Sequence, residues 1–321
     1  MYHNNDEYHE EFRPRLIIWS LTASRNGEEK DQALSTNECM VILDSIARLS
    51  KPIVILTGPA ILHRPDIYEI LAYGYAVGLK VIIESDAVDI TEDVLRKLHS
   101  FGPRVLRVAI DDLIREGNED RYETDPGYLT LEKNLQRLKE AGFEIHLCIT
   151  VNKPDERNLA FNLDFALRHS ARGLYCHLSF DCENGGETVP TDQLIMRISE
   201  LKRYIPENVY FSPQCLKYGL RHTIDGDDAS LDLRTVESDD GWTYWCLAGR
   251  TFAHIDHVGV VHVCAGQHQP CGNLRSNGYD FKEIWDGSEV YRRLRTSMYS
   301  CSEIRMMFGH PIKHKNTKGH P

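Results

Sequence analysis

The sequence predicts an α/β protein: a partial (β/α)6 barrel followed by a small C-terminal module made of a β-hairpin and a helix. Between residues 15 and 212, apolar runs of strand length alternate with amphipathic segments of helix length. The strand segments are rich in Val and Ile without strict alternation, which is typical of parallel sheets covered on both faces. A chain of 321 residues is long enough to bury a core in both parts.

The elements of the barrel follow one another in regular order. Strands are expected at 16–21, 53–57, 80–84, 105–110, 145–151, 173–180 and 209–212. Helices are expected near 36–49, 66–77, 91–100, 128–141, 156–169 and 191–204. Ser35 and Glu38 form a capping-box pattern at the start of the first helix, and Gly78 and Gly142 follow helices where a left-handed residue is favoured.

The C-terminal third has a different pattern. Residues 213–243 are acidic and rich in turn residues, so we expect a linker or surface loop. The segments 250–256 and 260–264 flank Gly259 and predict a β-hairpin, and 280–295 predicts a helix. The expected organisation is a tail at 1–14, the barrel at 15–212, the linker, the module at 244–304 and a second tail at 305–321.

Composition and charge exclude several classes of function. The net charge of −11 argues against general binding of nucleic acid or of an anionic membrane. No apolar run reaches the roughly 18–20 residues that span a bilayer, and the polar N-terminus is no signal peptide. We therefore expect a cytoplasmic protein whose nine cysteines are free thiols or metal ligands, not a disulfide framework.

The segment after the first expected strand resembles the opening of radical S-adenosylmethionine (SAM) enzymes of the peptide-modifying and haem-biosynthesis type. The resemblance rests on Trp19, Leu21, Thr22 and Asn26, and on the helix start at 34–36. In that family three cysteines at C-x3-C-x2-C spacing hold a [4Fe–4S] cluster, which binds SAM at its open iron. The register places those three positions at Arg25, Glu29 and Gln32.

None of these three residues is a thiolate, and iron–sulfur clusters are held chiefly by Cys. Arginine stays protonated and is not a ligand. The resemblance therefore implies a degenerate member without the SAM-binding cluster, for which the usual radical chemistry and SAM binding are not expected. Whether the chain is an enzyme of another kind stays open.

A second resemblance covers residues 55–69, which look like the family's strand-end segment T-G-G-E-P-L-L-x-R-P-D. Thr57 and Gly58 are kept, whereas Pro59 and Ala60 replace the second Gly and the acid that face SAM. Proline also removes a backbone donor. The vestigial SAM site implied by the resemblance consists of Thr57, Gly58, Ser85 and Asp111. For Ser85 and Asp111, ordinary turn or capping roles are an open alternative.

The C-terminal module resembles the SPASM/twitch extension, which carries auxiliary iron–sulfur clusters. Its pattern matches Cys246, Cys264 at the hairpin, and Cys301 after the helix, with Cys271 as a possible fourth ligand. Three interpretations stay open: one auxiliary [4Fe–4S] cluster on these cysteines, a zinc site that includes His262 or His268, and buried thiols without a metal.

The functional expectation is a binding or scaffold partner in the maturation of a peptide or of a tetrapyrrole-type cofactor. Its partner would be an active radical SAM homologue, a peptide or a small molecule. One alternative is an enzyme or electron-transfer protein with one auxiliary cluster. Another is a non-radical enzyme at the barrel mouth, whose acid–base groups would be Glu29, His63, Asp86 or Asp111.

Overall fold

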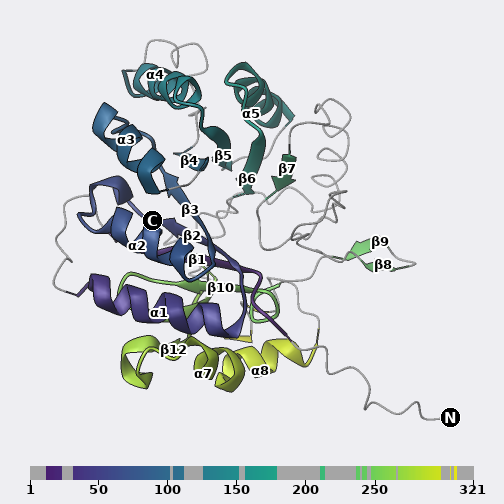
Figure 1. Ribbon diagram of the computed structural model, residues 1–321. Coiled ribbons are helices and arrows are strands. Elements are labelled where there is room, and N and C mark those ends of the chain that lie inside the picture. The colour runs from purple at the N-terminus through teal and green to yellow at the C-terminus, as the bar shows by residue number, and fades with distance from the viewer. Residues whose placement is uncertain are drawn as a thin grey trace, which may run out of the picture. The chain divides into compact units, whose positions relative to one another are not determined.

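The computed structural model describes two compact units, each of which is treated by itself (Figure 1). The described residues are 12–23, 32–101, 104–111, 126–151, 156–178, 210–213, 236–238, 241–243, 247–264 and 267–297, with residues 304, 307 and 308. The first unit holds those among 1–82 and 247–298. The second holds those among 83–222, 232–246 and 299–321.

The first unit is built on a sheet in the order β12-β11-β10-β1-β2. Its strands are β1 (Leu16–Ser20), β2 (Ile53–Thr57), β10 (Phe252–Ile255), β11 (Val260–Cys264) and β12 (Gln267–Asn273). β1 pairs in parallel with β2 on one side and β10 on the other, whereas β11 and β12 are antiparallel. The predicted hairpin therefore extends the sheet of the first barrel strand.

Helices cover the first unit where the sequence places amphipathic segments. They are α1 (Thr36–Leu49), η1 (Ile61–His63), α2 (Ile67–Ala76), η3 (Leu274–Asn277), α7 (Phe281–Gly287) and α8 (Glu289–Arg295). α1 packs against both α2 and α7 (Figure 1). Its buried face is made by Ile42, Leu43, Ile46 and Leu49, which recur at helical spacing.

The expected single helix at 280–295 is two helices in the structure. Ser288 ends α7, where its backbone N–H donates to the Ile284 carbonyl, and it starts α8, where its hydroxyl accepts from the Tyr291 N–H. A serine favours this capping geometry over a helix interior, because its hydroxyl replaces the missing backbone partner. The continuous helix was therefore a wrong prediction.

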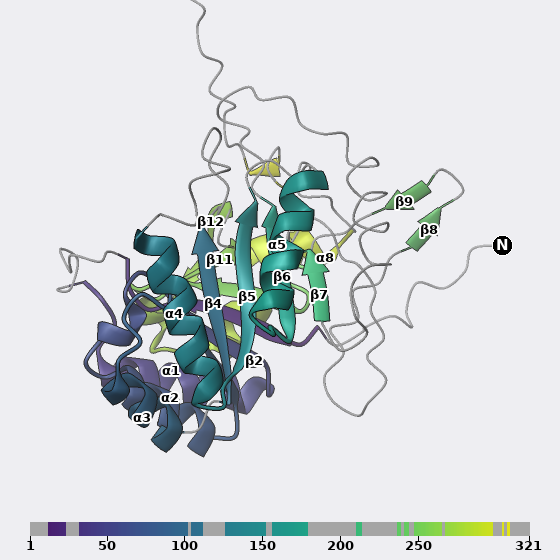
Figure 2. The same cartoon turned by 90° about the horizontal axis from the view of Figure 1, so that it is seen from above.

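The second unit is a parallel sheet with helices on it. β3 (Lys80–Ser85) leads into this unit, and its last three residues pair with β4 (Val105–Asp111). β5 (Glu144–Val151), β6 (Gly173–Leu178) and β7 (Tyr210–Pro213) follow in order, all parallel. The helices are α3 (Glu92–Phe101), α4 (Pro126–Glu140) and α5 (Glu156–Arg168). Figure 2 shows α4 and α5 over β5 and β6.

The α/β fold class and the barrel strands are confirmed, and among the described strands none closes the sheet into a complete barrel. The segment 213–243, expected as a linker or surface loop, contains an antiparallel hairpin of β8 (Val236–Ser238) and β9 (Gly241–Thr243). Strands of three residues are too short to show a periodicity. The expected helix at 191–204 lies outside the described residues. None of the described helices combines the length and apolarity that a membrane span requires.

Substitution of Gly249 tests the close contact between this residue and Tyr291 of α8. Its φ is +72°, and an added Cβ would lie 2.6 Å from Cδ1 of Tyr291, which is fully buried. Gly278 has a similar φ of +69° with open space around it. Both alanine variants should lose about 1 kcal/mol from the left-handed backbone. Gly249→Ala should lose about 1–3 kcal/mol more through overpacking. Equal shifts of the urea unfolding midpoint would contradict this packing.

Candidate functional site

Arg64 joins the two stems of the loop that follows β1. Its Nη1 donates to the Leu21 carbonyl at 2.9 Å and its Nη2 to the Leu34 carbonyl at 2.7 Å. Asp66 holds the guanidinium in place, with Nε to Oδ1 at 2.7 Å and Nη2 to Oδ2 at 3.0 Å. Because one planar group contacts both stems, the start and the end of the loop are held at a fixed separation.

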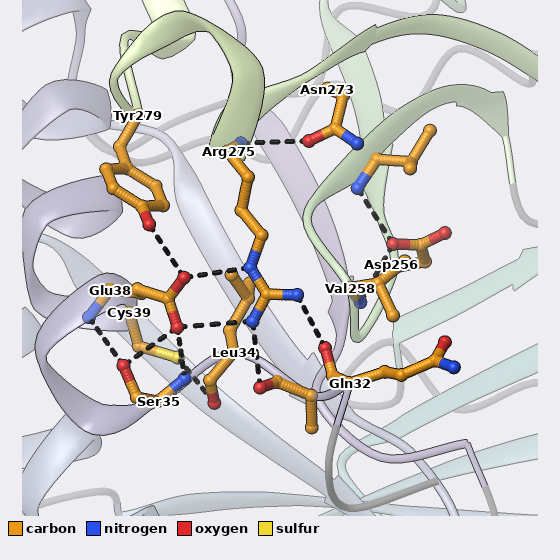
Figure 3. Close-up of polar contacts among 12 residues, drawn as sticks. Gln32, Leu34, Ser35, Glu38, Cys39, Asp256, Val258, Asn273, Arg275 and Tyr279 are labelled. Atoms are coloured by element: carbon orange, nitrogen blue, oxygen red, sulfur yellow. Dashed lines mark hydrogen bonds and ion pairs between the residues drawn. The ribbon is translucent and has the colours of Figure 1, made fainter.

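Arg275, from η3 of the C-terminal module, holds the end of the same loop (Figure 3). Its Nη1 donates to the Gln32 carbonyl at 2.7 Å and its Nη2 to the Ala33 carbonyl at 3.0 Å. The same guanidinium is paired with Glu38, with Nε to Oε1 at 2.8 Å. The loop and the C-terminal module are thus connected through one side chain.

Glu38 is the acceptor at the centre of this network (Figure 3). Its carboxylate accepts from the Ser35 N–H at 2.7 Å and hydroxyl at 2.8 Å, and from the Tyr279 hydroxyl at 2.7 Å. These contacts confirm the predicted capping box and add two partners from the distant module. Hydrogen bonds from Arg275 and Ser35 hold the pKa of Glu38 well below its usual range, although burial opposes this.

The described part of the loop does not fit the family's SAM-binding cluster. Gln32, at one of the three expected ligand positions, uses its carbonyl as an acceptor for Arg275 and has an amide side chain. Arg25 and Glu29, at the other two, lie outside the described residues. The sequence has no cysteine between Trp19 and Ser35, so the loop offers no thiolate to iron.

Hydrogen bonds join the residues that follow β1 to the end of β2. By the resemblance, this is where the backbone of the radical SAM enzymes approaches SAM. The Leu21 N–H donates to the Thr57 carbonyl at 2.8 Å, and the Thr22 hydroxyl donates to the Pro59 carbonyl at 2.9 Å. Gly58 has a φ of +134°, and a Cβ there would lie 2.2 Å from Oγ1 of Thr22. The close backbone approach that this glycine permits is therefore made to Thr22 of the chain itself.

Ser85 and Asp111, the other two residues of the implied SAM site, belong to the second unit. The Ser85 hydroxyl accepts from the Ala87 N–H at 3.2 Å, and Asp86 in the same way accepts from the Val88 N–H at 3.1 Å. Asp111 ends β4, and its side chain lies outside the described part. For Ser85, these contacts agree with the turn role.

The sequence analysis missed a buried polar cluster on β3, β4, β5 and β6 of the second unit. Arg107 is 4% exposed, pairs through Nε with Glu84 at 2.9 Å, and contacts the Cys148 thiol. Its Cζ lies 4.4 Å from the ring centre of Tyr175. Burial raises the pKa of Cys148 to about 12 despite Arg107, so this thiol is protonated and a poor nucleophile at neutral pH. A charged residue within an apolar strand was the available signal.

Two histidines of the hairpin lie opposite each other on β10 and β11. His254 Nε2 is 3.0 Å from the Ser20 hydroxyl, and His262 Nε2 is 2.8 Å from Asp256 Oδ2. The two rings are 5.8 Å apart. Burial opposes ionisation of Asp256, but the bonds from His262 and from backbone N–H groups keep its pKa below the ordinary value. Asp256 thus fixes the orientation of His262.

Cys264 and Cys271 lie close enough to influence each other's ionisation. Burial and the neighbouring Cys264 raise the pKa of Cys271 to about 12, although hydroxyl groups of Tyr291 and Ser288 and the charge of Arg295 act in the opposite direction. The Cys271 thiol is therefore protonated at neutral pH. Two of the four expected ligands are thus described, and they lie on neighbouring strands, Cys264 at the end of β11 and Cys271 on β12.

The other two candidates, Cys246 and Cys301, lie outside the described residues, as does the side chain of His268. Within the described ranges, no group of three or more His, Cys, Asp or Glu side chains is arranged to hold a metal. Nη2 of Arg295, on the neighbouring helix α8, is buried without a hydrogen-bond partner within the described part of the chain.

Comparison with known proteins shows the fold. No family model matches the chain. The structure is similar to the crystal structure of Streptococcus suis SuiB bound to S-adenosylmethionine, with a TM-score of 0.63 at 13% identity, covering 89% of this chain and 68% of that one. The structure of SuiB bound to its precursor peptide SuiA gives a TM-score of 0.60 at 13% identity, with 89% and 67% covered. The arrangement of strands and helices is a radical SAM fold.

The relatives in sequence are named for particular reactions. The chain is 29% identical over 307 residues to the AdoMet-dependent heme synthase of Methanosarcina barkeri, covering 88% of this chain and 85% of that protein. It is 25% identical over 307 residues to the mycofactocin maturase MftC of Mycobacterium tuberculosis, covering 88% and 73%. The relatives are thus named for tetrapyrrole synthesis and peptide maturation.

The Glu38 network predicts a pH-dependent stability. Because the folded pKa of Glu38 is lowered, its contribution is present above the unfolded pKa and is lost as the pH falls below about 4. Glu38→Gln should cost about 1–3 kcal/mol at pH 7, and the difference from wild type should shrink at low pH. Glu289→Gln, at a carboxylate that is 83% exposed, is the control. Urea unfolding from pH 3 to 8 measures both, and a difference that is constant with pH would contradict the prediction.

Proposed function

We propose that this chain is a catalytically degenerate radical SAM-like protein that acts as a binding or scaffold partner in the maturation of a peptide or a tetrapyrrole-type cofactor. The observation that carries the proposal is the loop after β1. It has no thiolate, and its ends are held by hydrogen bonds from Arg64 and Arg275. Radical chemistry on SAM is performed by the iron–sulfur cluster, so a chain that cannot bind this cluster is not expected to carry it out.

The packing of β1 and α1 is retained, and this supports a protein that still binds a partner over one that has lost all function. β1 keeps a buried core with Ile17 and Trp19 both at 0% exposure, and α1 keeps its capping box. The groups that would face SAM are replaced, whereas those that position the loop are present: Arg64 and Asp66 form an ion pair at 2.7 Å. This combination is expected when a chain is selected to present a surface and no longer to perform the reaction.

The names of the relatives suggest which classes of partner this chain binds. One of the solved structures holds a precursor peptide, and the sequence relatives are named for heme and mycofactocin. A peptide, a tetrapyrrole or an active radical SAM homologue is therefore the partner that we propose. The acidic net charge of −11 makes nucleic acid and anionic membrane poor partners.

A second candidate function is favoured by the cysteines of the hairpin module. Cys264 ends β11 and Cys271 lies on the neighbouring strand β12, and the two thiols interact electrostatically. Together with Cys246 and Cys301, these thiols are proposed to hold one auxiliary metal centre, either a [4Fe–4S] cluster or zinc. Such a centre would supply electron transfer if it is iron–sulfur and structural support if it is zinc.

Calorimetry of the full chain tests the leading proposal. Three titrants are compared under anaerobic conditions: SAM, coproporphyrin III as the tetrapyrrole probe, and the precursor peptide SuiA as the peptide probe. We expect no binding heat with SAM and a saturable one-to-one isotherm with one of the other two. A SAM-binding radical SAM enzyme such as SuiB is the positive control for SAM.

A SAM isotherm as strong as that of the control would contradict the degenerate site. Failure of both other probes, together with no co-purified radical SAM homologue from the native cell, would contradict the scaffold role.

A further inference from the structure

One end of the first unit is formed by the residues that lead into its parallel strands β1, β2 and β10. The Arg15 N–H, just before β1, donates to the Thr251 carbonyl, just before β10, at 2.8 Å. The Ile53 N–H, at the start of β2, donates to the Arg15 carbonyl at 2.9 Å. The starts of the three strands therefore lie side by side at this end of the unit.

Three helices end at the same place. Nη1 of Arg13 donates to the Leu49 carbonyl in the last turn of α1 at 3.3 Å. Nζ of Lys51 donates to the carbonyl of the C-cap residue of α2. Nη2 of Arg250 donates to the Ser297 carbonyl, just beyond α8, at 2.8 Å. We call this end the base of the first unit, and it comprises residues 13–15, 48–51, 77–80, 249–251 and 292–297.

The exposed charged side chains of the base are all basic. The segments that form it contain no Asp or Glu. The nearest carboxylates along α8 and α1 are Glu289, which pairs with Arg292 at 3.5 Å, and Asp44, which accepts from the Tyr73 hydroxyl at 2.9 Å. Six basic residues of the base are exposed: Arg15, Arg48, Lys51, Lys80, Arg292 and Arg293.

Local structure explains only part of this concentration of charge. Arg48 and Arg293 lie in the last turns of α1 and α8, where a cation complements the helix dipole. Arg15 and Lys80 lie at the starts of strands, where no helix end favours a cation. The whole chain has a net charge of −11, so the cations of the base stand out against an acidic remainder. A surface of this kind attracts an anionic partner.

The chemistry of the base narrows that partner to a polypeptide. An extended polyanion such as nucleic acid or an anionic membrane also meets the acidic remainder of the chain, which repels it. A short carboxylate-rich stretch is covered by the base alone. Four of the six exposed cations are arginines, whose planar guanidinium groups pair with carboxylates in bidentate geometry.

We propose that the base of the first unit is a docking surface for a carboxylate-rich stretch of another protein. This inference rests on the proposed function as a binding or scaffold partner, and it names the surface and the chemistry of that contact. The base lies at the start of β1 and the loop at its end, and five residues of strand span about 16 Å. A protein bound at the base therefore leaves the loop after β1 accessible.

The experiment measures binding of a fluorescently labelled decaglutamate peptide to the full chain by fluorescence anisotropy at low ionic strength. Labelled duplex DNA is the second probe. Wild type is compared with a base variant that carries Arg48→Gln, Lys80→Gln and Arg292→Gln. These residues are exposed and come from three different elements. Circular dichroism checks that each variant is folded.

The matched control carries Arg96→Gln, Lys133→Gln and Arg172→Gln. These three residues are exposed and belong to the second unit. The control and the base variant have the same net charge, so any difference between them reflects the position of the cations and not their number.

We expect wild type to bind decaglutamate saturably, with an affinity that falls as added salt screens the charges. The base variant should bind about tenfold more weakly, because three exposed ion pairs are lost. The control variant should stay within about twofold of wild type, since it keeps the base intact. Duplex DNA should bind wild type more weakly than decaglutamate does.

Four results would overturn the proposal. The first two are no saturable binding of decaglutamate by wild type and an equal loss of affinity in the base and control variants. The third is tighter binding of duplex DNA than of decaglutamate, which would assign the base to nucleic acid. The fourth is a concentration-dependent dimer of wild type in sedimentation velocity that the base variant loses, which would make the partner a second copy of this chain.

Failure here is distinguishable from failure of the proposed function. The base variant should give the same calorimetric results with SAM and coproporphyrin III as wild type. A chain that binds coproporphyrin III but not decaglutamate refutes only the docking surface. A chain that binds SAM as strongly as SuiB refutes the degenerate site, whatever the base binds.

Discussion

The fixed ends of the loop after β1 depend on two arginines whose planar groups each bond to backbone carbonyls at its stems. Arg64 spans Leu21 and Leu34, and Arg275 holds Gln32 while it pairs with Glu38. A guanidinium presents several donors in one rigid plane, so it fixes the relative position of its acceptors in a way that lysine does not. This constraint sets where the loop leaves the sheet and where it returns to α1.

Arg275 also connects the loop after β1 to the C-terminal module, which belongs to the same first unit. β10 pairs in parallel with β1, and η3 supplies Arg275. The hairpin is therefore continuous with the strand that carries the loop, and its own thiols, Cys264 and Cys271, lie in the same unit. In this chain, Gly58 is packed against Thr22 and the loop has no thiolate, and both observations support the proposed role of presenting a surface.

Local features of the fold were predictable from the sequence, and long-range polar pairing was not. The barrel strands and most helices follow from apolar runs and caps, and the Ser35–Glu38 box was found from its spacing alone. The break at Ser288 was missed because one capping serine competes with a continuous amphipathic pattern. The Arg275–Glu38 pair joins residues 237 positions apart, and no local pattern signals such a contact. The Arg107 cluster is missed for the same reason, since its members are single residues on four strands.

The most direct test of the degenerate site is the formation of 5′-deoxyadenosine from SAM by the full chain, reconstituted with iron and sulfide and reduced with dithionite. The account predicts no product above the level of a protein-free control, whether or not an auxiliary centre has been loaded, because the loop after β1 supplies no thiolates to bind a cluster that would cleave SAM. Repeated turnover to 5′-deoxyadenosine, abolished by omission of iron, would contradict it.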